Sequence, residues 1–259
     1  MKENLLKTIW RQRSMIWIFA INDLKLRYRN SILGVLWSFL EPLLLLGVMY
    51  VVFTTLFHNA IENYPLYLLL GLILWNMMSR GTSMGSSSLL NRSGLIQKIY
   101  FRRELFVISS VLTSFLMMCF EFCAFTLFMI FFGVVPPITI VFFPLVLVTL
   151  FIFSLGVSLY LSSLNVYYRD IQYIWAVLLQ AGFFVTPLFY KLNIFPEKIQ
   201  AILSLNPMVG IMEISRALII KAPMPSINII LVTIIGTAII FVSGYFVFKK
   251  LDYRLVEEL

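Results

Sequence analysis

The chain has 259 residues, of which 61% are hydrophobic and only 12% are charged. Soluble domains carry about 25% charged residues, so this composition excludes a water-soluble fold. The formal net charge of +8 is spread between apolar segments and does not gather on one water-facing surface, which argues against a nucleic-acid-binding protein. The composition therefore predicts an all-α membrane protein.

Six apolar segments, each long enough to cross a bilayer, follow one another along the chain. The last is uncharged until it ends at Lys249 and Lys250, whereas Arg80 interrupts the second. Fifteen of the 20 Lys and Arg residues lie before the first span, after spans two and four, or after span six. Because basic residues are retained in the cytoplasm, both termini are predicted to be cytoplasmic. The six predicted spans are residues 32–57, 64–90, 105–132, 138–164, 171–190 and 227–248.

The segment before the first span, residues 1–31, combines apolar with basic side chains near its end. This pattern is typical of an amphipathic helix in the membrane interface, where cations meet lipid phosphates. A plain cytoplasmic extension of the first span is the alternative, and the two differ only in tilt. The interface residues are predicted to include Lys25, Arg27, Tyr28 and Arg29.

Two connections between spans have a composition of their own. The loop at residues 91–105 mixes apolar and basic residues, so it is either a surface helix that docks a soluble partner or a basic loop that fixes topology. Residues 191–226 contain four prolines and are too apolar for a solvated loop, which predicts short re-entrant helices buried against protein. One of these helices should run from Met208, with Glu213 and Arg216 paired on one face.

Several polar and aromatic residues fall inside the predicted spans. A carboxylate inside the membrane is energetically costly. Each one is therefore predicted either to serve a gate or kink or to form a buried hydrogen bond to a neighbouring helix. The aromatic residues face either lipid or a conduit. Candidates for lining or gating a path are Trp37, Glu41, Trp75, Arg80, Glu121, Phe183, Phe184 and Tyr190.

Small residues and cysteines inside the spans have simpler readings. Gly81 and Gly85 predict a close helix contact, either within the chain or between two copies. Cys119 and Cys123 are expected to be packing thiols on a buried helix face. The single histidine, His58, cannot form a multi-histidine metal site, so we expect no metal centre and no catalytic residue.

Five segments resemble, in order, the permease subunits of type 2 ABC exporters, and together they cover nearly the whole chain. The first is DLKLRYRNSILGVLWSFLEPLL at residues 23–44. The chain is most similar to permeases that export lipid-linked polysaccharide such as O-antigen, with teichoic acid and capsule exporters as near relatives. The other four segments are YPLYLLLGLILWNMMS, NRSGLIQKIYF, LNVYYRDIQYIW and LSLNPMV.

The resemblance implies a homodimer in the bacterial inner membrane that works with two copies of a separate ATPase. ATP and Mg²⁺ would bind to that ATPase, and a polyprenyl-linked glycan would pass between spans one, two and five. The sequence agrees, because it contains no Gly-Lys dipeptide and therefore no phosphate-binding G-x-x-x-x-G-K-[ST] loop. One permease domain would fill residues 1–259. Its interface helix would lie in residues 1–31 and spans one to five in residues 32–190. The re-entrant helices would follow in residues 191–226, and span six with a cytoplasmic tail in residues 227–259.

By the same resemblance, the loop after span two would carry a coupling helix that fits a cleft on the ATPase, beside the interface helix. Relatives often have Phe-Pro-Arg-Glu-Leu after this helix, whereas here Phe101 precedes two arginines, so span three should begin less sharply. A drug or lipid permease of the same architecture is one alternative, and a membrane enzyme acting on polyprenyl phosphate is another. The implied ATPase-coupling residues are Leu95, Ile96, Gln97, Lys98, Ile99, Tyr100, Arg102 and Arg103.

Overall fold

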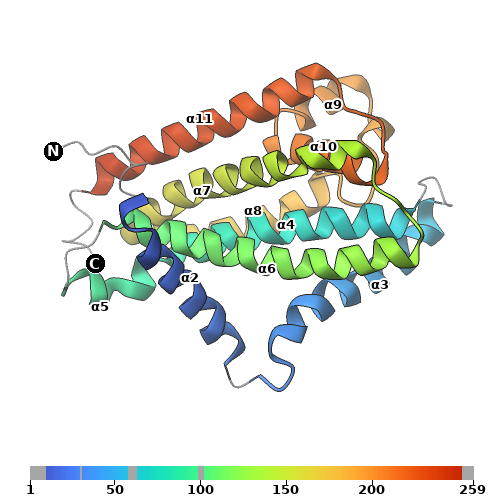
Figure 1. Cartoon of the computed structure of the whole chain (residues 1–259). Coiled ribbons are helices and arrows are strands. Elements are labelled where there is room, and N and C mark those ends of the chain that lie inside the picture. Colours follow the sequence, from blue (N-terminus) through green and yellow to red (C-terminus); the bar gives the residue numbers. More distant parts are fainter. Residues whose placement is uncertain (1–9, 30, 58–62, 99–101, 253–259) are drawn as a thin grey trace.

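A computed structural model describes residues 10–29, 31–57, 63–98 and 102–252. Within these residues every regular element is a helix, which confirms the prediction of an all-α fold (Figure 1). Short 3₁₀ turns join several of the helices. The α-helices are α2 (Arg13–Tyr28), α3 (Trp37–Phe57), α4 (Tyr64–Ser87), α5 (Ser93–Ile96), α6 (Glu104–Phe131), α7 (Phe143–Tyr167), α8 (Ile171–Val185), α9 (Glu197–Leu203), α10 (Pro207–Ile220) and α11 (Ile227–Asp252).

The long helices lie side by side in one elongated bundle, with α5 at one end and α9 and α10 at the other (Figure 1). We name these the α5 end and the α9 end. Helix α4 is the centre of the bundle and packs against α3, α6, α7, α8 and α10. All nine of its residues from 66 to 74 are buried, because neighbouring helices surround this part of it.

Small residues let α4 approach its neighbours closely. A Cβ atom added to Gly81 would lie 3.5 Å from Ser114 Cβ on α6, and one added to Gly85 would lie 2.6 Å from Ser158 Cβ on α7. These two glycines therefore serve packing within the chain, the first of the two readings that the sequence left open. Helices α7 and α11 also meet at backbone distance, since a Cβ on Gly156 would lie 2.7 Å from Phe241 Cα.

Three helical segments of the described chain are long and apolar enough to cross a membrane: α6, Ile138–Tyr167 and α11. The pair α9 and α10, bent by 99°, would add a fourth if it counts as one span. The remaining predicted spans coincide with α3, α4 and α8, which do not meet this criterion. Helix α8 has 15 residues, or roughly 22 Å of length against a hydrocarbon core of about 30 Å. Helix α4 contains Arg80 and several serines, which lower its hydropathy, although neighbouring helices enclose its apolar first half.

Helix α2 packs on α6 through one face only. Ile16 and Ala20 are buried there, and the Thr113 hydroxyl of α6 donates to the Ala20 carbonyl oxygen at 3.2 Å. Figure 1 shows α2 and α3 leaving the bundle toward their junction. The opposite face of α2 exposes apolar side chains beside basic ones, including Trp17 and Leu26, the surface expected of an interface helix.

Candidate functional site

Arg92 joins three helices at the α5 end. It closes the 3₁₀ turn Leu90–Arg92, which leads directly into α5. Its guanidinium pairs with Asp23 of α2 and donates to the Phe106 carbonyl oxygen and the Ser109 hydroxyl of α6, at 3.3 and 3.1 Å. The rings of Phe19 and Phe106 lie 5.2 and 5.4 Å from the guanidinium carbon. Arg92 therefore connects the turn before α5 to both α2 and α6.

Sequence reasoning missed the role of Arg92, which it treated only as one basic residue of a loop. Asp23 was the available signal, because it is the only acidic residue of α2 and sits in an otherwise basic segment. An acid in such a segment needs a cationic partner if it is to be buried. The partner is 69 residues away in the sequence, so spacing alone could not identify it.

The residues implied to couple to an ATPase divide into two groups. Ile96 is buried and Leu95 is partly buried, and both pack against the core of this chain. Gln97 and Lys98 are exposed, as is Gly94, so the accessible surface of the α5 turn is polar. Ile99 and Tyr100 lie outside the described residues.

The two arginines that follow α5 have acidic neighbours within the chain. Arg103 pairs with the Asp252 carboxylate of α11 at 2.6 Å, and Lys249 of α11 pairs with Glu104 at 2.9 Å. Arg102 lies 3.9 Å from the same Glu104 carboxylate, which is buried. The start of α6 is thus fastened to the end of α11, next to the predicted coupling segment.

Two of the predicted intramembrane charges form a pair. The Arg80 guanidinium of α4 donates to the Glu121 carboxylate of α6, and Arg80 Nε donates to the Asn76 carbonyl oxygen at 3.2 Å. The Glu121 side chain is fully buried and that of Arg80 is 12% exposed. The two residues were predicted separately, and only the packing of α4 on α6 brings them together.

Glu41 does not join this pair. It is exposed on α3 and faces an open hollow of about 460 Å³ between α3 and α2. The basic interface residues Lys25, Arg27 and Arg29 are also exposed, while Tyr28 is partly buried. The residues lining the hollow are Arg27, Tyr28, Ser31, Trp37, Glu41 and Leu44.

The predicted aromatic path residues differ in exposure. Trp37 of α3 and Phe184 of α8 are exposed, at 44% and 56%. Trp75 and Tyr190 are buried, and Phe183 lies against Trp75 with its ring centroid 6.0 Å away. Within one copy of the chain, only Trp37 and Phe184 of these five offer an open aromatic surface.

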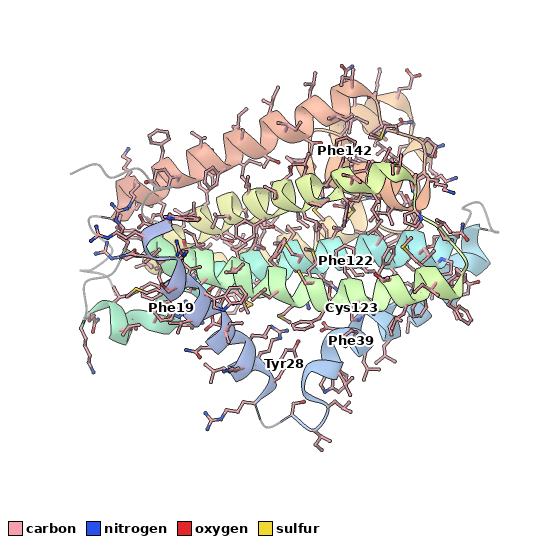
Figure 2. The ribbon with its side chains drawn as sticks, in the orientation of Figure 1. Phe19, Tyr28, Phe39, Phe122, Cys123 and Phe142 are labelled. Atoms are coloured by element: carbon pink, nitrogen blue, oxygen red, sulfur yellow. The ribbon has the colours of Figure 1, made fainter. Side chains whose placement is uncertain are left out.

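Three smaller expectations have different outcomes. The pair of Glu213 and Arg216 on α10 is confirmed, with Arg216 Nη1 3.0 Å from Glu213 Oε1. The packing assignment of Cys119 and Cys123 is wrong for the single chain, because both are exposed on α6, and Figure 2 shows Cys123 on the side where α2 and α3 lie. His58 lies outside the described residues. Among the residues that are described, no group of three or more His, Cys, Asp and Glu side chains could hold a metal ion.

The apolar helices long enough to cross a bilayer define a multi-pass membrane protein. The sequence profile described as ABC-2 type transporter matches residues 14–220, which is most of the chain. The chain therefore belongs to the ABC-2 type transporter family.

Three curated relatives match this chain over most of their own length. A protein of Klebsiella pneumoniae named O-antigen export system permease protein RfbA is 29% identical over 241 residues, 93% of each chain. A protein of the same name from Myxococcus xanthus is 30% identical over 226 residues, covering 85% of this chain and 86% of its own. A second Klebsiella pneumoniae protein of that name is 28% identical over 241 residues, again 93% of each chain.

Proposed function

We propose that this chain is the permease subunit of an ATP-driven exporter that moves a polyprenyl-linked polysaccharide across the bacterial inner membrane. The proposed polysaccharide is O-antigen. The observation that carries the proposal is the match to permeases named for O-antigen export along 93% of the chain. Such a match leaves no large segment of this chain for a different activity. Teichoic acid or capsule polymers are the closest alternative substrates.

The working unit in this proposal is a homodimer with the α5 end in the cytoplasm and six membrane spans, including α3, α4 and α8. Two copies would enclose the path for the glycan. Both α3 and α8 carry exposed apolar side chains in the single chain, which a second copy or lipid would cover. These side chains include Leu44, Val48 and Val51 on α3, and Ile174, Val177 and Leu178 on α8.

The path would use the exposed members of the predicted lining set: Trp37, Glu41 and Phe184. Flat aromatic faces and single polar groups suit a polymer that must slide, because repeated weak contacts do not stall it. Arg80 and Glu121 would act by holding α4 to α6 and not by touching the glycan. Lipid contacts would fall on the basic outer face of α2.

Two copies of a cytoplasmic ATPase would dock on the α5 ends and bind ATP and Mg²⁺. The link from Arg92 to both α2 and α6 supports this arrangement, since it offers a route from the docking turn into the bundle. The docking surface would consist of Gly94, Gln97 and Lys98, because Leu95 and Ile96 face inward.

Replacing Gly94 with Trp is expected to reduce copurification of the ATPase about tenfold, as a large side chain would block the centre of the interface. Nothing lies within 4 Å of a Cβ atom at this position, so the fold should tolerate the change. Gly94→Ala is the matched control, because a single methyl group fits the same open surroundings and leaves the docking surface accessible. Wild-type recovery of the ATPase with Gly94→Trp would remove α5 from the docking surface.

The direct test is ATP hydrolysis by this chain with its candidate ATPase in lipid nanodiscs. Lipid-linked glycan is expected to stimulate hydrolysis several-fold, while the same glycan without its lipid should not. Stimulation by small hydrophobic drugs alone would instead identify a drug permease. Conversion of a polyprenyl-linked substrate by this chain without any ATPase would identify a membrane enzyme and overturn the proposal.

A further inference from the structure

The chain leaves its helical path after α8. Helix α8 ends at Val185, and Thr186 is extended with ψ 138°. Pro187 explains the break, because proline has no N–H to continue the helix and disfavours helical geometry in the residue before it. All five residues of the break, 186–190, are buried.

A buried non-helical segment in a membrane protein must satisfy its backbone polar groups within the protein. Here seven consecutive carbonyl oxygens, from Phe184 to Tyr190, each accept a hydrogen bond. The Tyr190 hydroxyl donates to the Phe184 and Val185 carbonyl oxygens at 2.9 and 2.8 Å. The Leu188 N–H donates to the Thr186 carbonyl oxygen at 2.7 Å. From α4, the Tyr64 hydroxyl donates to the Phe189 carbonyl oxygen at 3.1 Å and the Tyr67 hydroxyl donates to the Tyr190 carbonyl oxygen at 2.9 Å.

Arg216 of α10 supplies the two donors in the middle of this series. Its Nη1 and Nη2 atoms donate to the Pro187 and Leu188 carbonyl oxygens, both at 2.7 Å. A guanidinium presents two N–H groups in a fixed fork, which suits two adjacent acceptors. The side chain is fully buried, and Glu213 at 3.0 Å balances its charge.

The same arginine is pressed against α4. Its guanidinium carbon lies 3.5 Å from the centroid of the Tyr67 ring. A Cβ atom added to Gly71 would lie 3.0 Å from Arg216 Nη2 and 3.3 Å from the Leu188 carbonyl oxygen. The break after α8, helix α10 and helix α4 therefore meet at one buried side chain.

We propose that Arg216 is a positioning residue for transport: it fastens the break at residues 186–190 to α4 and keeps this end of the path closed between transport steps. The inference rests on the proposed function, because the path is that of the exported glycan. Without the clamp, ATP hydrolysis at the α5 end would continue, but the α9 end would no longer follow α4. Hydrolysis and export would become uncoupled.

The test compares Arg216→Met, Arg216→Lys and Ser215→Ala in proteoliposomes that contain the ATPase. Ser215 is a buried neighbour that hydrogen-bonds only within its own helix in the described contacts, to the Ile211 carbonyl oxygen at 2.7 Å. Arg216→Met should lower the glycan exported per ATP hydrolysed about tenfold, because two buried carbonyls lose their donors. Arg216→Lys should recover part of the ratio, Ser215→Ala should match wild type, and glycan-stimulated hydrolysis should persist in all three.

A spin label at Val185→Cys provides a readout that does not depend on the substrate. Val185 is 54% exposed, and Cys119 and Cys123 would first be replaced by Ala. The label should be less mobile in the parent chain than in the Arg216→Met variant. Should that variant fail to insert, Tyr67→Phe should give a smaller increase, since it removes one hydrogen bond and keeps the ring under Arg216.

The outcomes separate this inference from the proposed function. Unchanged label mobility in the Arg216 and Tyr67 variants would overturn the clamp. Parallel loss of hydrolysis and export would also overturn it, because that pattern indicates a general folding defect. A wild-type complex that ignores lipid-linked glycan while the label responds as expected would instead overturn the proposed substrate.

Discussion

Replacing Glu121 with Leu is expected to lower the free energy of unfolding by about 3–5 kcal/mol, because it leaves the Arg80 guanidinium buried without its counter-charge. The two side chains form an ion pair between α4 and α6, and Glu121 is fully buried. A guanidinium stays charged at any accessible pH, so Arg80 could not become neutral by losing a proton. The measurement is denaturant unfolding of the purified chain in mixed micelles.

The opposite single change should be milder. In Arg80→Leu the stranded Glu121 carboxylate can bind a proton and become neutral, an option that arginine lacks. The double variant Arg80→Leu, Glu121→Leu should recover most of the lost stability, because apolar side chains of similar size often replace a buried ion pair without loss. Glu41→Leu is the control, since Glu41 is exposed. Equal losses for Glu41→Leu and Glu121→Leu would contradict the structural role of the pair.

Replacing Gly244 with Leu is expected to separate α11 from α7 and to lower the free energy of unfolding by about 3 kcal/mol. A Cβ atom at Gly244 would meet the carbonyl oxygen of Gly156, and the Tyr160 ring would lie 3.1 Å away. Backbone atoms cannot turn aside as a flexible side chain can, so the helices must move apart. Small residues at such crossings are what allow membrane helices to pack closely.

The matched control for this change is Gly47→Leu on α3. Nothing lies within 4 Å of a Cβ atom at Gly47, so the same substitution should leave stability within about 0.5 kcal/mol of wild type. Gly156→Leu should resemble Gly244→Leu, because both glycines belong to one contact. Similar unfolding curves for the Gly47 and Gly244 variants would show that α7 and α11 tolerate a wider spacing.

Local patterns predicted most helices of this protein but not their partners. The uncharged run before Lys249 predicted α11, and proline spacing predicted a helix close to Pro207–Ile220. The pair of Glu213 and Arg216 was predictable too, since residues three apart on a helix are neighbours. In contrast, Arg92 meets Asp23 across 69 positions and Arg80 meets Glu121 across 41. No local rule links residues so far apart.

Exposure was the property that the sequence described least well. Trp75 and Phe184 were equal candidates as aromatic residues of predicted spans, yet the first is buried under α8 and the second is exposed. Cys119 and Cys123 were assigned to packing, and both are exposed. Apolar composition cannot distinguish lipid-facing from protein-facing positions, because lipid tails and protein cores favour the same side chains.

By itself, then, the sequence determined that this is a helical membrane protein, where most of its helices lie and which transporter family it resembles. These properties depend on composition, periodicity and short motifs, all of which are local. Only the tertiary structure decided that α4 is the enclosed centre, that Arg92 and Arg80 have acidic partners, and that Arg216 fills the break after α8. Those decisions depend on which helices touch, and the burial of charge makes each contact specific.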